Sequence, residues 1–307
     1  MQEAHRLAKL EPPGRGRTVS MVLDTDTFNE VDDQFAVAYA VRAAQAGELK
    51  LEAVYAAPFS NQMGTTPQLG MELSYQEILK VMDRLHCPEW GRLVYRGSGY
   101  KMDSGELHDS PAVRDLICRA MDRSEDDPLY LVSIGAATNV ASALRIEPRI
   151  ADRLVLVWLG GNALHWPHVK EYNVCQDITA AQTVLDSGIP LVLMPAYNVV
   201  AIMNTTIFEL EHYLDGKSDI GTYLTQIVRE YAARAEQGTA WSKVIWDVVG
   251  VAYLLHPEWI QTSLAHTPIL TDDLHWAHDQ TRPLMRIAEF VRRDPIFMDV
   301  FQKLAQS

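Results

Sequence analysis

Short apolar runs alternate with stretches of helical periodicity along most of the chain, and this alternation limits the fold more than any other feature. The clearest apolar runs are Leu129–Ile134, Leu154–Leu159 and Ile189–Met194. Segments with helical spacing, such as Pro111–Met121 and Asp177–Ser187, lie between or beside them. Strands that alternate with helices form a mostly parallel sheet with helices on its faces. The sequence therefore predicts an α/β fold with a mostly parallel central sheet flanked by helices.

From Thr205 onward the pattern changes to mostly helix. Further helices are expected at Ile207–Leu214, Gly221–Ala235, Asp247–Leu255 and Pro295–Ala305, and edge strands at Thr267–Thr271 and Asp273–Trp276. No repeat, low-complexity tract or linker divides the chain. We therefore expect a single domain over residues 18–307 with a helical C-terminal cap. Residues 1–17 lack the apolar core of a signal peptide and are expected to form a mobile N-terminal arm.

Composition and charge exclude several classes of partner. The 307 residues include 27 basic and 40 acidic side chains, for a formal net charge of -13. This charge argues against nucleic acid and anionic membranes and suits a neutral or cationic small ligand. No run approaches the roughly 18 apolar residues that a membrane span needs. Three cysteines provide no disulfide framework, which predicts a cytoplasmic location.

An acidic turn joins the first predicted strand, Thr18–Leu23, to the first predicted helix. Half of the ten turn residues are carboxylic acids: Asp24, Asp26, Glu30, Asp32 and Asp33. Like charges this close repel each other unless a cation or a helix N-terminus compensates. A hard divalent ion with oxygen ligands is one explanation, and an acidic surface loop that caps a helix is the other. An EF-hand loop does not fit, because Asn29 stands where that loop requires glycine.

Polar residues also follow the other predicted strands. They include Asn61 after the second strand, the Ile134–Gly135 step, and Glu171 with Asn173 after Leu154–Leu159, while Trp246 and Asp247 open a later helix. The carboxyl ends of parallel strands meet at one edge of a sheet, where open α/β sheets bind their ligands. We therefore expect these groups to line one crevice.

These segments together resemble the inosine–uridine-preferring nucleoside hydrolase family, calcium enzymes that release free base and ribose from nucleosides. The family begins with a strand followed by DxDPGxDD, and here the stretch is DTDTFNEVDD, two residues longer between its acidic pairs. The segments that match later family elements are, in order, LYLVSIGAATNVASAL, VWLGGNALHWPHVKEYN, QDITAAQTVLDSGIPLVL and IWDVVGVAYLLHPEW. The resemblance covers roughly residues 19 to 259 and implies the family's Rossmann-like core.

The resemblance implies a calcium site and a catalytic base. Its ligands correspond to Asp26, Asp33, the main-chain carbonyl of Ile134, and Asp247. Asp26 also corresponds to the base that activates water for attack on an oxocarbenium-like centre. Asp24 corresponds to a supporting carboxylate.

The resemblance also implies a set of ribose-binding groups. Asp32 and Asn173 correspond to ligands of the 2′- and 3′-hydroxyls, and Glu171 to a ligand of the 5′-hydroxyl. Asn61 aligns with a family asparagine beside the pocket. The second 5′-hydroxyl asparagine has two candidates, Asn162 and His165.

Two further departures from the family bear on the substrate. Asn29 and Glu30 belong to the lengthened turn, where they either contact metal or sugar or face solvent. Trp246 stands where pyrimidine-tolerant members carry a histidine that helps to protonate the leaving base. Purine-preferring members carry tryptophan there, so a stacked aromatic ring would activate a purine. Core packing is the alternative role for Trp246.

Our main hypothesis is a calcium-dependent hydrolase of the N-glycosidic bond of a ribonucleoside, with purines slightly favoured. The resemblance implies a homo-oligomer, either a dimer or a tetramer. One alternative is a haloacid-dehalogenase-like phosphatase, which also places DxD after its first strand, although Phe28 stands where that signature needs Thr or Val. The other is a non-catalytic nucleoside- or ribose-binding protein on the same fold.

Overall fold

The computed structural model describes residues 3–14, 16–61, 64–102, 109–234 and 240–306. Its strands are β1 (Ser20–Thr25), β2 (Lys50–Ala56), β3 (Val94–Arg96), β4 (Leu129–Ser133), β5 (Leu154–Leu159), β6 (Leu191–Met194), β7 (Asn204–Thr205), β8 (Lys243–Val244), β9 (Ile260–His266), β10 (Ile269–Leu270), β11 (Trp276–Ala277) and β12 (Leu284–Val291). Its helices are α1 (Glu3–Leu10), α2 (Asp33–Gln45), α3 (Pro67–Arg84), α4 (Pro111–Met121), α5 (Thr138–Ile146), α6 (Tyr172–Gln176), α7 (Ile178–Asp186), α8 (Ile207–Tyr213), α9 (Asp219–Arg234), α10 (Val248–Leu255) and α11 (Arg293–Leu304).

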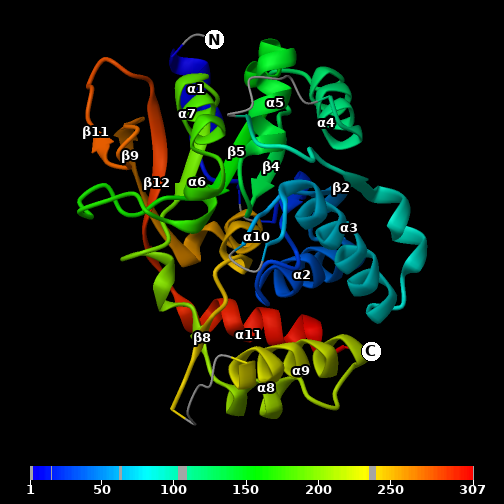
Figure 1. Cartoon of the computed structure of the whole chain (residues 1–307). Coiled ribbons are helices and arrows are strands. Elements are labelled where there is room, and N and C mark those ends of the chain that lie inside the picture. Colours follow the sequence, from blue (N-terminus) through cyan, green and yellow to red (C-terminus); the bar gives the residue numbers. More distant parts are fainter. Residues whose placement is uncertain (1–2, 15, 62–63, 103–108, 235–239, 307) are drawn as a thin grey trace.

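Among the described residues, eight strands form one sheet in the order β3-β2-β1-β4-β5-β6-β12-β9 (Figure 1). Neighbouring strands run parallel except β12 and β9, which are antiparallel. The chain passes from β1 outward to β2 and β3, then crosses back to β4 on the other side of β1. The strand order therefore reverses between β1 and β4, and such switch points are where open α/β sheets bind ligands. The predicted mostly parallel α/β sheet is confirmed.

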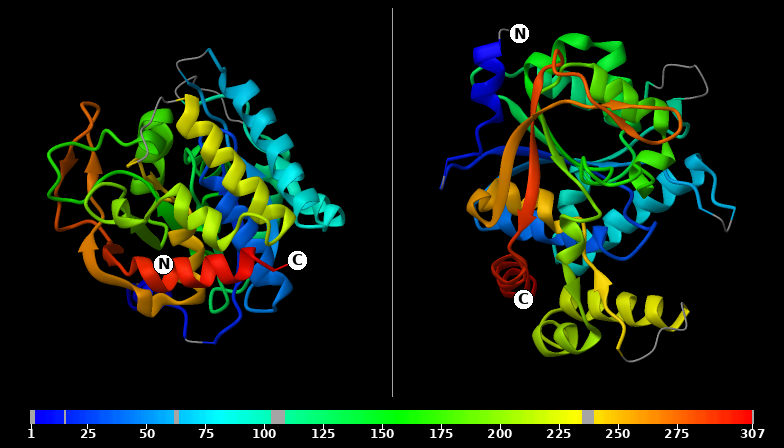
Figure 2. Two further views of the ribbon diagram at one scale, coloured as in Figure 1. Left: turned by 90° about the horizontal axis from the view of Figure 1, so that it is seen from below. Right: turned by 90° about the vertical axis from the view of Figure 1, so that its left-hand side faces the viewer.

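Helices cover both faces of the sheet, because successive side chains of each buried strand point to opposite faces. Met21 and Leu23 of β1 belong to a core that includes α2, α3, α10 and α11. Val22, between them in the sequence, belongs to a second core with α4, α5 and α7. Figures 1 and 2 show these two helical layers on either side of the strands.

The prediction that the chain beyond Thr205 is mostly helical is wrong for two long strands, β9 and β12. Polar residues interrupt both apolar patterns, and Arg286 lies in the middle of β12. Its buried guanidinium donates to the carbonyl of Leu10 at 2.5 Å and to Oγ1 of Thr262 at 3.0 Å. These long-range partners make an arginine acceptable in a central strand, and a local pattern does not reveal them.

The structure also corrects the expectation of a mobile arm for Glu3–Leu10, which forms helix α1 against the sheet domain. Arg6 is buried and donates to the carbonyls of Leu284 at 2.9 Å and Ile189 at 3.0 Å. Leu10 is fully buried. None of the helices in the described part of the chain is both long enough and apolar enough to cross a membrane.

Helices α8 and α9 form an excursion between β6 and α10. Strands β7 and β8 pair antiparallel at its base, with Thr205 opposite Lys243. Figure 2 shows the excursion extending away from the main sheet. The returning strand β8 leads directly into α10, so this excursion delivers Lys243, Trp246 and Asp247 to the sheet edge.

Candidate active site

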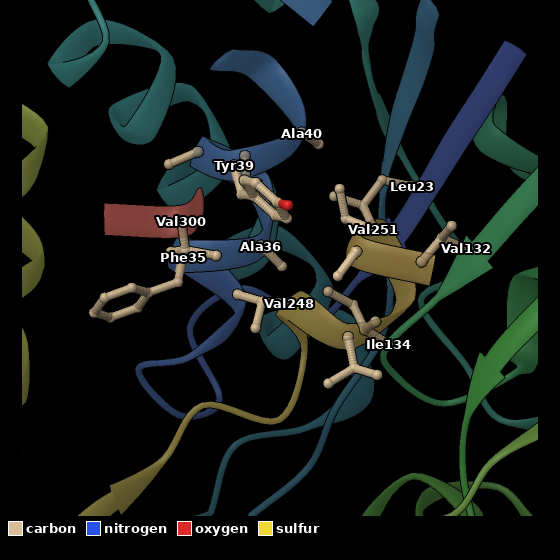
Figure 3. Close-up of a cluster of buried hydrophobic side chains, with 14 of the residues drawn as sticks. Leu23, Phe35, Ala36, Tyr39, Ala40, Val132, Ile134, Val248, Val251 and Val300 are labelled. Carbon is tan, nitrogen blue, oxygen red and sulfur yellow. The ribbon is translucent and has the colours of Figure 1, made fainter. Parts of the chain in front are cut away.

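Two helices begin side by side at the carboxyl edge of the sheet. α2 begins at Asp33 after the acidic turn, and α10 begins at Val248 with Asp247 at its N-cap. Figure 3 shows Val248 and Val251 of α10 near Ala36 of α2, in the same buried cluster as Leu23 and Val132 of the sheet. This apolar packing brings together acidic groups that lie more than two hundred positions apart.

The packing of α10 on β4 is close because α10 contains glycine at position 250. A Cβ atom on Gly250 would lie 2.6 Å from Cγ1 of Val132. Gly135 plays a similar part beside Asp26, since a Cβ there would lie 2.9 Å from Oδ1 of the carboxylate. Small residues at these two positions let the carboxylates approach the strand ends.

A pocket opens at this edge. It includes the predicted site residues except Asp24, Asn61 and the two candidates for the second 5′-hydroxyl ligand, Asn162 and His165. Its lining residues are Asp26, Asn29, Glu30, Asp32, Asp33, Ile134, Leu159, Glu171, Tyr172, Asn173, Ala196, Tyr197, Trp246 and Asp247. Apart from Asn61, the strand-end groups expected to line one crevice therefore contribute to this pocket, at the switch point between β1 and β4.

Three buried carboxylates form the tightest acidic group in this pocket. One oxygen each of Asp32, Asp33 and Asp247 lies within 4.8 Å of the others. Burial, together with the charges of Asp32 and Glu30, raises the pKa of Asp33 to about 8. Burial and the charge of Asp32 raise the pKa of Asp247 well above its usual range. Without a compensating cation, Asp33 and Asp247 therefore resist ionisation.

Asp26 supplies a further carboxylate to the same pocket. Its Oδ2 atom is buried and has no hydrogen-bond partner. Burial and the charge of Asp33 raise its pKa well above the usual range. A buried carboxylate oxygen without a partner is costly in a protein, and a bound cation satisfies it. The residues present therefore fit a hard divalent ion, which prefers several oxygen ligands.

Other residues hold the acidic strand end in place. Thr25 Oγ1 donates to Oδ1 of Asp33 at 2.5 Å. Asp24 is fully buried and lies outside the pocket, where it accepts from Asn139 Nδ2 at 2.8 Å and Ser133 Oγ at 3.0 Å. Burial raises the pKa of Asp24 to about 7, against the opposing effect of these hydrogen bonds. Asp24 thus ties β1 to β4 and α5 beneath the site.

The segment after β5 presents amide and carboxylate groups opposite the acidic cluster. Asn173 Nδ2 donates to the carbonyls of Ile134 at 3.1 Å and Leu159 at 2.9 Å. Both amide hydrogens are thereby used, which leaves the side-chain oxygen to accept from a ligand. The carbonyl of Ile134 keeps one lone pair beyond the bond to Asn173, so it remains able to coordinate an ion.

Glu171 caps the short helix α6. It accepts from the backbone nitrogens of Asn173 at 2.9 Å, Gly161 at 2.9 Å and Val174 at 3.1 Å. Burial raises the pKa of Glu171 to about 7, and these backbone hydrogen bonds oppose the rise. The carboxylate is therefore rigidly placed in the pocket wall.

Aromatic side chains form the outer wall. Tyr172, Tyr197 and Trp246 line the pocket, and Tyr197 is 45% exposed. The Tyr197 ring stacks against Trp166 with centroids 6.1 Å apart, and Trp246 meets Tyr197 edge to face at 5.8 Å. The local sequence gave no sign that residues 166, 197 and 246 would meet, because they come from separate loops.

Three of the remaining candidate residues have other partners. Asn162 is fully buried, and its side chain donates to the carbonyl of His168 at 3.0 Å and accepts from the backbone of Tyr197 at 3.3 Å. His165 pairs with Asn198 at 2.8 Å. Neither candidate for the second 5′-hydroxyl ligand lines the described pocket. Asn61 lies outside the described lining as well, and its Oδ1 accepts from the backbone nitrogen of Thr65 at 3.4 Å.

Sequence reasoning missed the lining residues Tyr172 and Tyr197. It also missed Lys243, which lies outside the described lining but contacts two of the acidic residues in it. Its ammonium group lies 3.4 Å from Oδ1 of Asp32 and also donates to Glu30. Burial alone would lower the pKa of Lys243, but the charges of Asp32 and Glu30 raise it above its usual value. The residue lies in β8, and nothing in its local pattern distinguishes it from a surface lysine.

The family model for inosine-uridine preferring nucleoside hydrolases matches residues 21–297. The pyrimidine-specific ribonucleoside hydrolase RihA of Escherichia coli O127:H6 (strain E2348/69 / EPEC) is 26% identical over 164 residues, which are 50% of this chain and 52% of that protein. RihA of Salmonella paratyphi B (strain ATCC BAA-1250 / SPB7) is 28% identical over 142 residues, or 44% and 45%. The matched chain spans about half the length of these curated relatives.

Solved structures show the same fold along nearly the whole chain. A purine-preferring ribonucleoside hydrolase from Gardnerella vaginalis superposes with a TM-score of 0.72 at 21% identity, covering 93% of this chain and 98% of that one. The type III effector protein XopQ, complexed with adenosine diphosphate ribose, has a TM-score of 0.67 at 18% identity, covering 99% and 98%. On the strength of the family match across residues 21–297, this chain belongs to the inosine-uridine preferring nucleoside hydrolase family.

Proposed function

We propose that this protein hydrolyses the N-glycosidic bond of a ribonucleoside, yielding free base and ribose, and that it requires calcium. The observation that carries the proposal is the convergence of Asp26, Asp32, Asp33 and Asp247 in one pocket at the switch point of the sheet. Family membership supports the same activity. It leaves the phosphatase hypothesis without support, since that hypothesis depended on the DxD pattern alone.

Asp26, Asp33, Asp247 and the carbonyl of Ile134 are the groups proposed to hold the ion. Asp32 shares the tight acidic group with two of them and is proposed to contact the sugar. When bound there, calcium supplies a positive charge that offsets the carboxylates and polarises the sugar hydroxyls and the attacking water. Calcium is favoured over softer metals because every candidate ligand is an oxygen atom.

Asp26 is proposed to take a proton from the attacking water. It lines the pocket, and an ionised carboxylate that gives one oxygen to an ion keeps its second oxygen to accept that proton. A positioned general base contributes roughly 10²- to 10⁴-fold to a rate. The ionised form of Asp26 is needed for this role, and that form depends on compensation of the surrounding negative charge.

The ribose hydroxyls are proposed to contact Asp32, Asn173 and Glu171. Asn173 offers its side-chain oxygen, because its amide hydrogens are bonded to two carbonyls. In glycoside hydrolysis, hydrogen bonds to the 2-hydroxyl tighten as the oxocarbenium-like transition state forms. Fixed acceptors therefore favour the transition state over the bound nucleoside.

The leaving base is proposed to lie against Trp246 and Tyr197, and this favours purines because a purine offers the larger stacking surface. The names of relatives do not decide the matter, since one solved relative is described as purine-preferring and the curated ones as pyrimidine-specific. The described pocket lining contains no Lys, Arg or His. A neutral nucleoside therefore suits this site better than a diphosphate such as adenosine diphosphate ribose.

Two further expectations, on cellular location and oligomeric state, accompany this proposal. The three cysteines, Cys87, Cys118 and Cys175, are all free thiols, which supports a reducing, cytoplasmic compartment. The homo-oligomeric state stays a prediction, and light scattering on the purified chain tests it.

The test of the function is release of reducing sugar from inosine, with uridine as the comparison substrate. Activity should require calcium, stop on chelation and return when calcium is added back. The Asp26→Ala variant should be inactive while remaining folded. Sugar release that survives both chelation and this substitution would refute the proposal. Tight binding of inosine to the wild-type protein without turnover would instead support the non-catalytic alternative.

A further inference from the structure

We propose that Lys243 is a positioning residue of this site, which orients the carboxylate of Asp32 toward the sugar and anchors the lengthened turn through Glu30. The inference rests on the proposed function and adds to it a residue outside the set implied by the family pattern. It also gives Glu30 a role, as the partner of a buried lysine.

The contacts of Asp32 explain why its orientation depends on Lys243. The backbone nitrogen of Trp246 donates to Oδ2 of Asp32 at 3.1 Å. The ammonium group of Lys243 approaches the other oxygen, Oδ1, at 3.4 Å. The two contacts act on opposite oxygens, so together they restrict rotation of the carboxylate. A fixed carboxylate loses less entropy when it accepts from a sugar diol than a freely rotating one does.

Lys243 itself is held in place by its surroundings. Its strand β8 pairs with β7, which fixes the backbone at the base of the α8–α9 excursion. The residue is only 6% exposed, and its ammonium group lies 5.6 Å from the centroid of the Tyr231 ring. A lysine this buried is rare unless its charge is paired. Here it is paired with two acidic side chains, Glu30 and Asp32.

The lengthened turn is held from two sides. Glu30 accepts from Lys243, which comes from the excursion before α10. Asn29 accepts from the hydroxyl group of Tyr172 at 2.7 Å, and Tyr172 lies between Glu171 and Asn173. Asn29 and Glu30 therefore connect this turn to α6 and to β8.

Lys243 also places a positive charge beside the acidic group. Coulomb's law predicts that removing this charge strengthens binding of a cation, because the remaining site is more negative. Removing Lys243 should also weaken binding of the sugar, because Asp32 loses its contact with the ammonium group. These effects have opposite signs for the two ligands. A lysine with only a structural role would not separate them.

The experiment compares Lys243→Met with Glu30→Gln and with the double variant, using the full chain. Calorimetry with calcium chloride measures the ion affinity, and steady-state kinetics with inosine measures kcat and KM. We expect Lys243→Met to bind calcium about three- to tenfold more tightly and to raise KM about tenfold. Lys243→Arg should raise KM less than Lys243→Met does, because arginine keeps a hydrogen-bond donor and a positive charge.

The double variant separates charge from positioning. It removes one positive and one negative group, so its calcium affinity should return close to the wild-type value. Its KM should stay raised, because Asp32 still lacks the donor from position 243. Glu30→Gln alone should weaken calcium binding by removing a negative charge. It provides the charge test even if Lys243→Met fails to fold, and Lys243→Arg then provides the positioning test.

Lys50→Met is the matched control. Lys50 begins β2 at the opposite, amino-terminal edge of the sheet, where it pairs with Glu52 at 2.8 Å. Lys50→Met also removes one positive charge, but at a place outside the pocket, so calcium affinity and KM should not change. Unchanged or weaker calcium binding by Lys243→Met, or an unchanged KM, overturns the inference. A wild-type protein that neither binds calcium nor releases sugar overturns the proposed function instead.

Discussion

Removal of calcium should make the stability of this protein depend on pH in an unusual direction. Asp33 has a pKa of about 8 in the folded, ion-free protein because of burial and the charges of Asp32 and Glu30, against an ordinary value of 3.8. Between these values the folded protein holds the proton and the unfolded chain does not. The free energy of unfolding therefore falls as pH rises through this window, and acidification from pH 8 to pH 6 stabilises the ion-free protein.

The size of the effect follows from the same pKa value. Lowering the pH from 8 to 6 takes Asp33 from half protonated to nearly fully protonated in the folded state, which contributes about 2 kcal/mol to the free energy of unfolding. For a protein of this size that corresponds to a rise in melting temperature of about 4 °C. Asp26 and Asp247 act in the same direction, because burial and neighbouring carboxylates raise their pKa values as well.

Calcium should oppose this trend, because the proposed site would hold the ion through ionised carboxylates. At a hundredfold excess over its dissociation constant, a ligand adds about 2.7 kcal/mol to the stability of the folded state. Protons compete for the same oxygens, so the stabilisation by calcium should be largest at pH 8 and smaller at pH 6.

Thermal unfolding in chelator and in calcium, at pH 6, 7 and 8, measures both effects. The control is Asp33→Asn, whose amide side chain does not titrate. This variant should show a flatter pH dependence in chelator and a smaller gain from calcium. The reasoning is refuted if acidification from pH 8 to pH 6 in chelator lowers the melting temperature of the wild-type protein relative to that of Asp33→Asn. A gain from calcium that does not change with pH refutes it too.

Three further predictions concern the chemistry, the base and the packing. Asp26→Asn should lower kcat for inosine, measured by sugar release, by about 10²- to 10⁴-fold. Thermal unfolding in chelator should show a melting temperature equal to or above that of the wild type. Trp246→Ala should lower kcat/KM for inosine about tenfold and for uridine less, because stacking on an aromatic ring contributes about 0.5–1.5 kcal/mol; equal losses would exclude a role in base preference. Gly250→Ala should cost about 1–3 kcal/mol in chemical denaturation and weaken calcium binding, because its Cβ would lie 2.6 Å from Val132 and displace Asp247.

Much of the fold follows from local pattern. The predicted segments Leu154–Leu159 and Pro111–Met121 have the same bounds as β5 and α4. Continuous apolar runs and well-capped helices identify such elements without help from the rest of the chain. β9 and β12 could not be found in this way. Their polar residues are stabilised by partners far along the chain, as Arg286 is by Leu10 and Thr262.

The residues of the candidate site were likewise predictable from the sequence only in part. The acidic turn was visible in the sequence because its carboxylates crowd a ten-residue stretch. Glu171, Asn173 and Asp247 were visible from their places after predicted strands or at a helix start, and the family resemblance supplied their roles. All of these except Asp24 line the pocket, together with Asn29. Asn61 does not line it within the described residues, and its side-chain oxygen accepts from the backbone nitrogen of Thr65 in its own loop.

By itself, the sequence determined the alternation of strands and helices and the collection of carboxylates at the end of the first strand. Both are local properties, set by the spacing of apolar residues and by charge density. Only the tertiary structure decided which distant groups meet those carboxylates. The packing of α10 on α2 brought in Asp247, and the pairing of β8 with β7 brought in Lys243. Because these contacts depend on the mutual placement of separate elements, no single stretch of the chain contains the information to predict them.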